Sequence, residues 1–435
     1  MRHAPIKPAL FQRNRERLRR LLLPNSLVVV NANDLLPTNA DGLLPMVPNS
    51  DLFYLTGIEQ EETILVMAPD ATDERQREIL FLRRPNPQLE TWEGHKLTRE
   101  EAQALSGIEE IRWLDEFPTV FHQLMCEVEH VYLNSNEHRR AVIEVQTRDA
   151  RFIRQCQERY PLHSYHRLAR LMHALRVVKS REEIDLIKKA CRITRQGFLR
   201  AARKIRPGLK EMEIEAEFAH EFTRQGARFA YPPIIAAGRN SCVLHYIRND
   251  AVCRKGEVVL LDVGACYANY NADLTRTLPV NGRFTRRQRQ VYEAVLRVQR
   301  AMIRACVPGT LHKDWQKQAE ALIQEELLRL GLLKPRDIRR QDPRNPALKR
   351  YFMHGLGHPL GLDVHDVGFM SEPFAPGWVL TVEPGIYIPE EGFGVRLEND
   401  VLVTEKEPVD LMADIPIEPD EIEELMSAAR RTRSR

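Results

Sequence analysis

Apolar residues in the first part of the chain gather in short runs that are separated by polar turns. Four of these runs predict β-strands, at residues 26–30, 63–68, 78–83 and 131–134. From Ser180 the spacing becomes helical, and Ser180 with Glu183 forms the S-x-x-E capping pattern of a helix start. This change of period predicts an α/β (α+β) chain, with an N-terminal mixed α/β domain over residues 1–175 and a second domain over residues 176–435.

The second half of the chain repeats itself. The stretch KGEVVLLDVGACY (255–267) aligns without a gap with PGWVLTVEPGIYI (376–388), so that Asp262 meets Glu383. Upstream, the tripeptides RPG and VPG each precede a helical stretch. Residues 180–435 are therefore predicted to form two copies of one helix-helix-strand unit. Such a duplication usually closes around a pseudo-two-fold axis, which is a good place for a site.

Each copy carries two carboxylates beside a turn. Asp262 and Asp273 flank ANYN in the first copy, and Glu383 and Glu398 flank PEEGFG in the second. In an antiparallel hairpin, residues equidistant from the turn face each other, so we expect each pair to be opposed with Cβ atoms roughly 4.5–5.5 Å apart. Four carboxylates that close would raise one another's pKa. Two divalent cations would remove this conflict.

A nitrogen ligand is available from the segment MHGLGHPLGLDVHD, which holds His354, His358 and His365 among glycines. Oxygen-dominated ligation with one imidazole favours a hard ion such as Mn²⁺, with Co²⁺ and Zn²⁺ as alternatives. Two metals roughly 3.5–4 Å apart generate a nucleophilic hydroxide and stabilise a tetrahedral oxyanion, which is the chemistry of acyl hydrolysis. Arg396 shares a strand face with Glu398, and it could orient a metal carboxylate or form an ordinary ion pair.

The composition argues against several classes of partner and against a membrane-spanning protein. The 435 residues include 64 basic and 61 acidic side chains, for a formal charge of +3, which gives no argument for a nucleic-acid or membrane partner. No apolar run approaches the roughly 18 residues of a membrane span. Seven scattered cysteines without a C-x-x-C pair suit a reduced, cytoplasmic protein. The basic segment 334–350 is either a docking loop or, more simply, a solvated connector.

Three stretches carry a resemblance to a known family. HGLGHPLGLDVHD, VLTVEPGIYI and GVRLENDVLVT closely resemble motifs of Xaa-Pro aminopeptidase (aminopeptidase P), within the pita-bread metallopeptidases. NSDLFYLTG (49–57) resembles that family's non-catalytic N-terminal domain. The resemblance covers essentially the whole chain. It implies a pita-bread catalytic domain, peptide substrates with proline at the second position, and a homo-oligomer, either a dimer or a tetramer.

The resemblance also implies a ligand set for two divalent metals. It falls on five residues: Asp262, Asp273, His358, Glu383 and Glu398. Asp273 and Glu398 would bridge both ions, and Glu383 would double as proton acceptor and donor. The chain departs from the family pattern at none of these five positions.

Substrate contacts follow from the same resemblance. His245, in CVLHYIRND, and His365 match the substrate-binding and transition-state histidines, and His354 matches a further histidine beside the site. Trp92, in ETWEG, matches an aromatic residue that a neighbouring subunit offers to the active site in some members. His245, Arg396 and Trp92 are candidates for the wall that holds the proline ring.

Alternative functions stay open at this point. Prolidases, which cleave only Xaa-Pro dipeptides, carry similar motifs but usually a longer insertion before the last glutamate, so the short loops here favour the aminopeptidase. Methionine aminopeptidases share the ligand pattern but normally lack the large N-terminal domain. A metal-free pita-bread binding module would have lost ligands, and the complete set argues against it.

Overall fold

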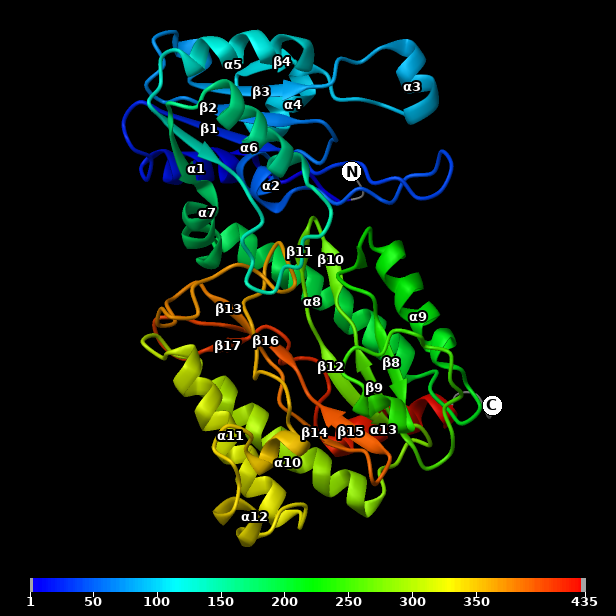
Figure 1. Ribbon diagram of the computed structural model, residues 1–435. Helices are drawn as coiled ribbons and strands as arrows, with labels where there is room; N and C mark the ends of the chain where they lie inside the picture. Colours follow the sequence, from blue (N-terminus) through cyan, green and yellow to red (C-terminus); the bar gives the residue numbers. More distant parts are fainter. Residues whose placement is uncertain (1–2, 432–435) are drawn as a thin grey trace. The chain divides into compact units, whose positions relative to one another are not determined.

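The computed structural model describes residues 3–431 and divides into two compact units. The first unit covers His3–Arg176, and the second begins at Val177. In Figure 1 the first unit runs from blue to green and the second from green to red. No helix within residues 3–431 is long and apolar enough to cross a membrane.

The first unit is built on a six-stranded mixed sheet in the order β4-β3-β2-β1-β5-β6. Its strands are β1 (Ser26–Asn31), β2 (Ile64–Met67), β3 (Glu78–Leu82), β4 (Glu110–Trp113), β5 (His130–Leu133) and β6 (Ser164–Arg167). The four strands expected from apolar runs are confirmed. The two that the runs did not predict, β4 and β6, are the edge strands, which are only partly buried and so lack a continuous apolar signal.

Helices accompany this sheet, and some of them pack on its faces. They are α1 (Pro8–Arg19), α2 (Ser50–Thr56), α3 (Pro87–Glu93), α4 (Arg99–Ser106), α5 (Phe117–Met125), α6 (Arg148–Arg159) and α7 (Leu168–Val177). Leu27 and Val29 of β1 pack in one core cluster with Phe121 of α5 and Cys156 of α6. On the other side, the ring of Phe11 in α1 meets that of Phe53 in α2, edge to face at 5.9 Å. Successive side chains of β1 point to opposite faces of the sheet, so the strand contributes to a hydrophobic core on each face.

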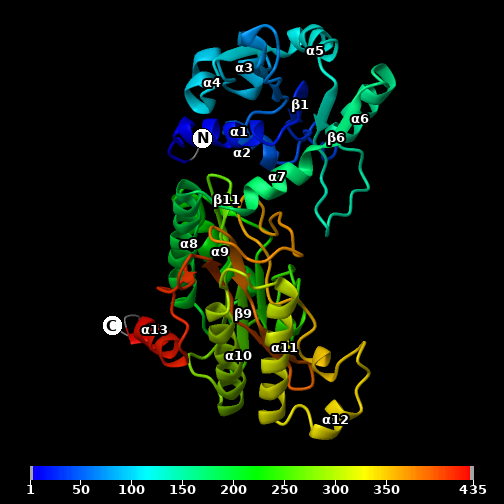
Figure 2. The same cartoon turned by 90° about the vertical axis from the view of Figure 1, so that its left-hand side faces the viewer.

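The second unit contains the duplication that the sequence predicts. Two long helix pairs, α8 (Arg181–Ala202) with α9 (Glu211–Arg224) and α10 (Arg286–Arg304) with α11 (His312–Arg329), each precede a set of strands. Figure 2 shows α10 and α11 side by side against the strands. The short α12 (Pro335–Arg339) and the C-terminal α13 (Pro419–Arg431) complete the helices. The capping box expected at the start of α8 is confirmed, because Ser180 and Glu183 bond each other's backbone N–H.

Matched glycines support the repeat at the level of the backbone. Gly208 and Gly309, before α9 and α11, have φ of 89° and 87°. Gly256 and Gly377, before the aligned strands, have φ of 89° and 91°. These left-handed values suit glycine, so the two copies turn the chain in the same way at the same places.

The strands of each copy form small antiparallel sheets. Their orders are β12-β9-β8 and β11-β10-β7 in the first copy, and β13-β16-β17 and β14-β15 in the second. Their bounds are β7 (Arg228–Phe229), β8 (Ile234–Ala237), β9 (Val258–Asp262), β10 (Ala265–Tyr267), β11 (Tyr270–Asn271), β12 (Thr275–Pro279), β13 (Val379–Val382), β14 (Gly385–Ile388), β15 (Phe393–Arg396), β16 (Asn399–Leu402) and β17 (Val409–Asp410). An antiparallel bridge between Thr275 and Glu398 joins the copies, which brings their carboxylates together.

Candidate metal centre

The first hairpin corrects one expectation about its carboxylates. Asp262 pairs with Thr275 across β9 and β12, so it does not directly oppose Asp273. The reason lies in the turn, where Ala268 and Asn269 both have positive φ, of 50° and 64°. A two-residue turn of this kind closes the hairpin at 268–269, later than the midpoint between the two aspartates. The offset is two residues, so both carboxylates still lie on one face.

The second hairpin has the expected register. Val382 pairs with Asn399 on one side, and Gly385 pairs with Arg396 on the other. Both pairings have the same register, which places Glu383 opposite Glu398. The expected opposition is therefore confirmed in the second copy.

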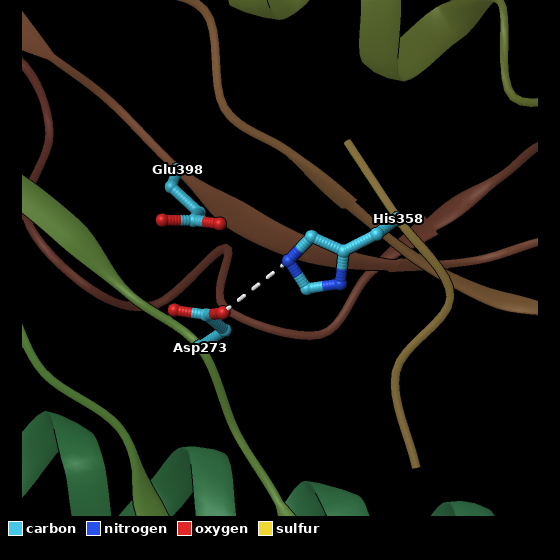
Figure 3. A group of neighbouring side chains, drawn as sticks. All are labelled: Asp273, His358 and Glu398. Carbon is cyan, nitrogen blue, oxygen red and sulfur yellow. Dashed lines mark ion pairs between the residues drawn. The ribbon is translucent and has the colours of Figure 1, made fainter. Parts of the chain in front are cut away.

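Three of the candidate ligands form a tight buried group. Ligand atoms of Asp273, His358 and Glu398 all lie within 4.8 Å of one another. Figure 3 shows the two carboxylates facing each other and the imidazole directed at Asp273. His358 Nε2 lies 3.6 Å from Asp273 Oδ2 and 3.8 Å from Glu383 Oε1. The other ring nitrogen, Nδ1, is 3.0 Å from the carbonyl oxygen of Pro359, and donation to that oxygen leaves Nε2 with a lone pair directed at the carboxylates.

Glycine makes this arrangement possible. The segment before His358 runs along β13 and just past its end, where Glu383 N–H donates to Leu356 O at 2.8 Å. A Cβ on Gly357 would lie 2.0 Å from the carbonyl oxygen of Thr381, so a larger residue would push the histidine segment off the strand. The glycine-rich sequence around the histidines therefore serves close backbone packing.

Asp262 is held by two groups at the edge of this cluster. Arg396 Nη2 donates to Asp262 Oδ2 in an ion pair. The hydroxyl oxygen of Tyr231 lies 2.6 Å from Asp262 Oδ1 and 2.5 Å from Asp273 Oδ1. Burial and the nearby carboxylates raise the pKa of Tyr231 well above its ordinary value, so it stays a donor. Arg396 was expected either to orient a metal carboxylate or to form an ordinary ion pair. It does form an ion pair, and the partner in that pair is the candidate metal ligand Asp262, so the two roles coincide.

Arg396 also connects the two copies through its other nitrogens. Arg396 Nε donates to Thr275 Oγ1 at 3.1 Å, and that hydroxyl donates to Glu398 Oε2 at 2.6 Å. Arg396 Nη1 donates to the hydroxyl oxygen of Tyr387 at 2.9 Å. Tyr387 in turn lies 2.8 Å from His354 Nε2. One buried guanidinium thus positions groups on both sides of the cluster.

His354 is a neutral acceptor in this network. Burial and the positive charge of Arg396 lower the pKa of His354 to about 3. Its Nδ1 lies 2.7 Å from the carbonyl oxygen of Gly355, which fixes the proton on that nitrogen. Nε2 therefore accepts from the Tyr387 hydroxyl.

The electrostatics of the cluster fit divalent cations. Burial and the neighbouring carboxylates raise the pKa of Asp273 and of Glu398 well above the usual range. Although burial disfavours its charge, the surrounding anions hold the pKa of Arg396 well above its ordinary value. Four carboxylates and one imidazole supply more negative charge than one guanidinium balances, and this donor set suits hard or borderline divalent ions. These residues could hold two such ions.

The remaining predicted residues lie in different places. His365 is exposed, and its ring centre is 4.2 Å from that of His358. His245 is exposed, and it lies close enough to His354 to contribute to the lowered pKa of that residue, after burial and Arg396. Trp92 lies on α3 of the first unit, with its side chain 85% exposed.

Four further residues of the site escaped the sequence analysis. Asp400 is fully buried and accepts the backbone N–H of Asp273 at 3.1 Å. Period-two spacing could have identified it, as well as Thr275 and Tyr387, because each lies two or four residues from a candidate ligand on the same strand face. Tyr231 carries no local signal, since only the tertiary fold brings it to the two aspartates.

Known proteins match the chain over both units. The model of "Metallopeptidase family M24" matches residues 185–405, and that of "Aminopeptidase P, N-terminal domain" matches residues 11–132. An Xaa-Pro aminopeptidase of Escherichia coli is 36% identical, over 97% of this chain and 98% of its own length.

Two solved structures match nearly the whole length of the chain. Escherichia coli aminopeptidase P with the inhibitor Pro-Leu has a TM-score of 0.87 at 34% identity, covering 98% of this chain and 100% of the other. A zinc-substituted Escherichia coli aminopeptidase P in complex with product has the same TM-score at 35% identity and the same coverage.

Proposed function

The chain belongs to metallopeptidase family M24, and on that premise we propose that it is an Xaa-Pro aminopeptidase. It would release the N-terminal residue from peptides whose second residue is proline. The observation that carries this proposal is the buried group of Asp273, His358 and Glu398, with Glu383 beside it.

Five side chains would hold the metals: Asp262, Asp273, His358, Glu383 and Glu398. When bound, a pair of divalent ions activates water at neutral pH and stabilises negative charge that develops on the scissile carbonyl oxygen. Manganese is the favoured ion because oxygen donors outnumber the single imidazole. Cobalt and zinc are the alternatives that elemental analysis of the purified protein would distinguish.

Glu383 is the carboxylate that moves the proton. Its side chain is 21% exposed, against 7% for Asp273, so it can reach a substrate while its Oε1 stays 3.8 Å from His358 Nε2. Glu383 would accept the proton of the attacking water and deliver it to the prolyl nitrogen as the bond breaks. A secondary amine is a poor leaving group without that proton.

The exposed histidines would bind the substrate. A bond before proline is a tertiary amide without an N–H, and its ring fixes φ, so the site must hold the peptide by other groups. His245 and His365 would contact the carbonyl and the developing oxyanion, while neutral His354 lies beside Glu383, with its Nδ1 3.9 Å from Glu383 Oε2. His245 and Trp92 are the exposed candidates for the wall against the ring, whereas Arg396, the third candidate, is buried and would act through the side chains that it bonds.

Assembly and compartment complete the proposal. We propose residues 1–175 as a non-catalytic domain and 176–435 as the catalytic domain of a homo-oligomer, either a dimer or a tetramer, in which Trp92 meets a neighbouring subunit's site. All seven cysteines are free thiols, which suits a reducing cytoplasm.

Product analysis by mass spectrometry tests the activity. With Mn²⁺ added, the enzyme should release one residue from Xaa-Pro peptides of three or more residues. N-acetylated peptides should be inert, and replacing proline by alanine should remove most of kcat/KM. Cleavage of dipeptides alone would identify a prolidase instead, and equal cleavage of Xaa-Ala peptides would remove the proline assignment.

A further inference from the structure

His245 lies in a loop whose two ends are defined by unusual backbone angles. The loop leaves β8 at Gly238, with φ of 52°, and closes at Asn249, with φ of 48°. Asn249 is buried, and its side chain accepts the N–H of Ile235 at 3.0 Å and donates to the carbonyl oxygen of Pro233 at 2.9 Å. The position of the exposed His245 thus depends on how this loop is anchored.

One buried carboxylate anchors the loop on both sides of His245. Glu211, the first residue of α9, is 0% exposed. Its Oε1 accepts the N–H of Ala237 at 2.7 Å and the side-chain amide of Asn240 at 3.1 Å. Its Oε2 accepts the hydroxyl of Tyr246 at 2.8 Å and the N–H of Ala251 at 2.9 Å. Ala237 and Asn240 precede the histidine, and Tyr246 and Ala251 follow it.

A carboxylate that accepts on both of its oxygens fits this arrangement. Its two oxygens offer about four lone pairs, which match the four donors, whereas an amide offers one oxygen and presents donors on the other side. The N-terminus of α9 also favours a negative charge at this position. Glu211 is therefore fitted to the loop in both geometry and charge.

Hydrogen bonds also join the anchored loop to β15, the strand that carries Arg396. Gly394 of β15 donates its N–H to Ser241 Oγ at 2.7 Å, and Ser241 Oγ donates to the carbonyl oxygen of Gly238. Displacing the loop would therefore move His245 relative to the strand that positions the metal carboxylates.

We propose that Glu211 is a positioning residue, which holds His245 at the substrate by clamping the segment from Ala237 to Ala251. This inference rests on the proposed function, because it acts through the substrate contact of His245. Glu211 itself touches neither the candidate ligands nor the substrate. Its removal should therefore lower turnover without removing metal.

Glu211→Gln is the direct test. In either orientation the glutamine amide faces the backbone N–H of Ala237 or of Ala251, so the clamp opens on one side. A misplacement of about 1 Å can cost about 10²-fold in rate, so we expect kcat to fall about 10- to 100-fold with metal content unchanged. Glu213→Gln is the matched control, because Glu213 is exposed on the same helix turn and only caps Lys210 N–H. It should keep wild-type kcat.

A double-mutant cycle separates positioning from a general structural effect. If Glu211 acts through His245, adding Glu211→Gln to His245→Ala should change kcat by less than threefold. Full additivity of the two losses would overturn the inference. Tyr246→Phe, which removes one of the four bonds and spares the buried carboxylate, should give a smaller loss of the same non-additive kind.

Hydrogen exchange supplies a readout that does not depend on activity. Backbone amides over 237–251 should exchange faster in Glu211→Gln than in wild type or Glu213→Gln, and unchanged protection would overturn the clamp. Failure of the proposed function would leave wild type and Glu213→Gln without Xaa-Pro activity as well. If only this inference fails, wild type and Glu213→Gln will be active, and Glu211→Gln will be as active as those two proteins.

Discussion

Removing the hydroxyl of Tyr231 tests how the carboxylates of the first hairpin are held for metal. That oxygen lies 2.6 Å from Asp262 Oδ1 and 2.5 Å from Asp273 Oδ1, and it carries a single proton for two acceptors. Its hydrogen bond lowers the pKa of Asp273, against the larger opposing effect of burial. Tyr231→Phe keeps the ring and removes this donor, so protons should compete with metal more strongly for Asp273.

The expected loss of metal affinity can be worked from this contact. A hydrogen bond to a charged group contributes about 1.5–3 kcal/mol. Each factor of ten in affinity corresponds to about 1.4 kcal/mol, so losing the bond should weaken metal binding about 10- to 150-fold. Removing a group that orients a metal ligand typically costs about 10- to 100-fold, which agrees with that range.

Calorimetric titration of metal-free protein with Mn²⁺ measures the effect. Tyr231→Phe should raise Kd by the stated factor, while kcat at saturating Mn²⁺ stays within a few-fold of wild type. Tyr270→Phe is the control, since the hydroxyl of Tyr270 in the same hairpin donates instead to Glu183, at 3.2 Å. Equal Kd values for wild type and Tyr231→Phe would refute the reasoning.

Further outcomes follow from the same geometry. Chelation should abolish peptide hydrolysis and Mn²⁺ should restore it; full activity in protein shown by elemental analysis to be metal-free would exclude the metal mechanism. Glu383→Gln keeps an oxygen ligand but cannot carry a proton, so kcat should fall about 10²- to 10⁴-fold, and a near-normal kcat would rule out the assigned role. Lys179→Met removes the buried ammonium that lies 2.9 Å from the carboxylate of Asp366, with each side chain 1% exposed; denaturant melts should show a loss of about 3–5 kcal/mol in unfolding free energy, and a loss below about 1 kcal/mol would contradict this. The pKa of Asp273 and of Glu398 is raised in the folded state, so the stability that these two groups contribute to the metal-free protein is fully present below their unfolded pKa of about 4 and is lost as pH rises through the folded pKa; the gain in Tm on adding Mn²⁺ should therefore be larger at pH 8 than at pH 5, and an equal gain would count against the charge conflict.

Local sequence rules predicted much of the architecture. Continuous apolar runs marked β1, β2, β3 and β5, because strands covered on both faces need apolar residues at successive positions. The start of α8 was predicted because a capping box acts within four residues. The duplication was predicted because both copies need glycine at the same left-handed positions. The edge strands β4 and β6 were not predicted, because strands with exposed faces carry no continuous apolar run.

At the site, residue types and repeat spacing were enough to propose the carboxylates as metal ligands. They also predicted that Glu383 lies opposite Glu398, which the register confirms, because strand periodicity is a local property. The offset of Asp262 from Asp273 depended instead on a turn at Ala268 with positive φ, a conformation that alanine seldom adopts and its neighbours do not predict.

The partners that hold these carboxylates could be known only from the folded chain. Tyr231 reaches two aspartates, 31 and 42 residues away, and Arg396 reaches Asp262 across 134 residues. Glu211 accepts hydrogen bonds from a loop, and the bonded loop residue nearest to it in the sequence, Ala237, is 26 residues away. Such contacts form because buried donors and acceptors must find partners wherever packing brings them together, and no pattern along the chain encodes which partner that will be.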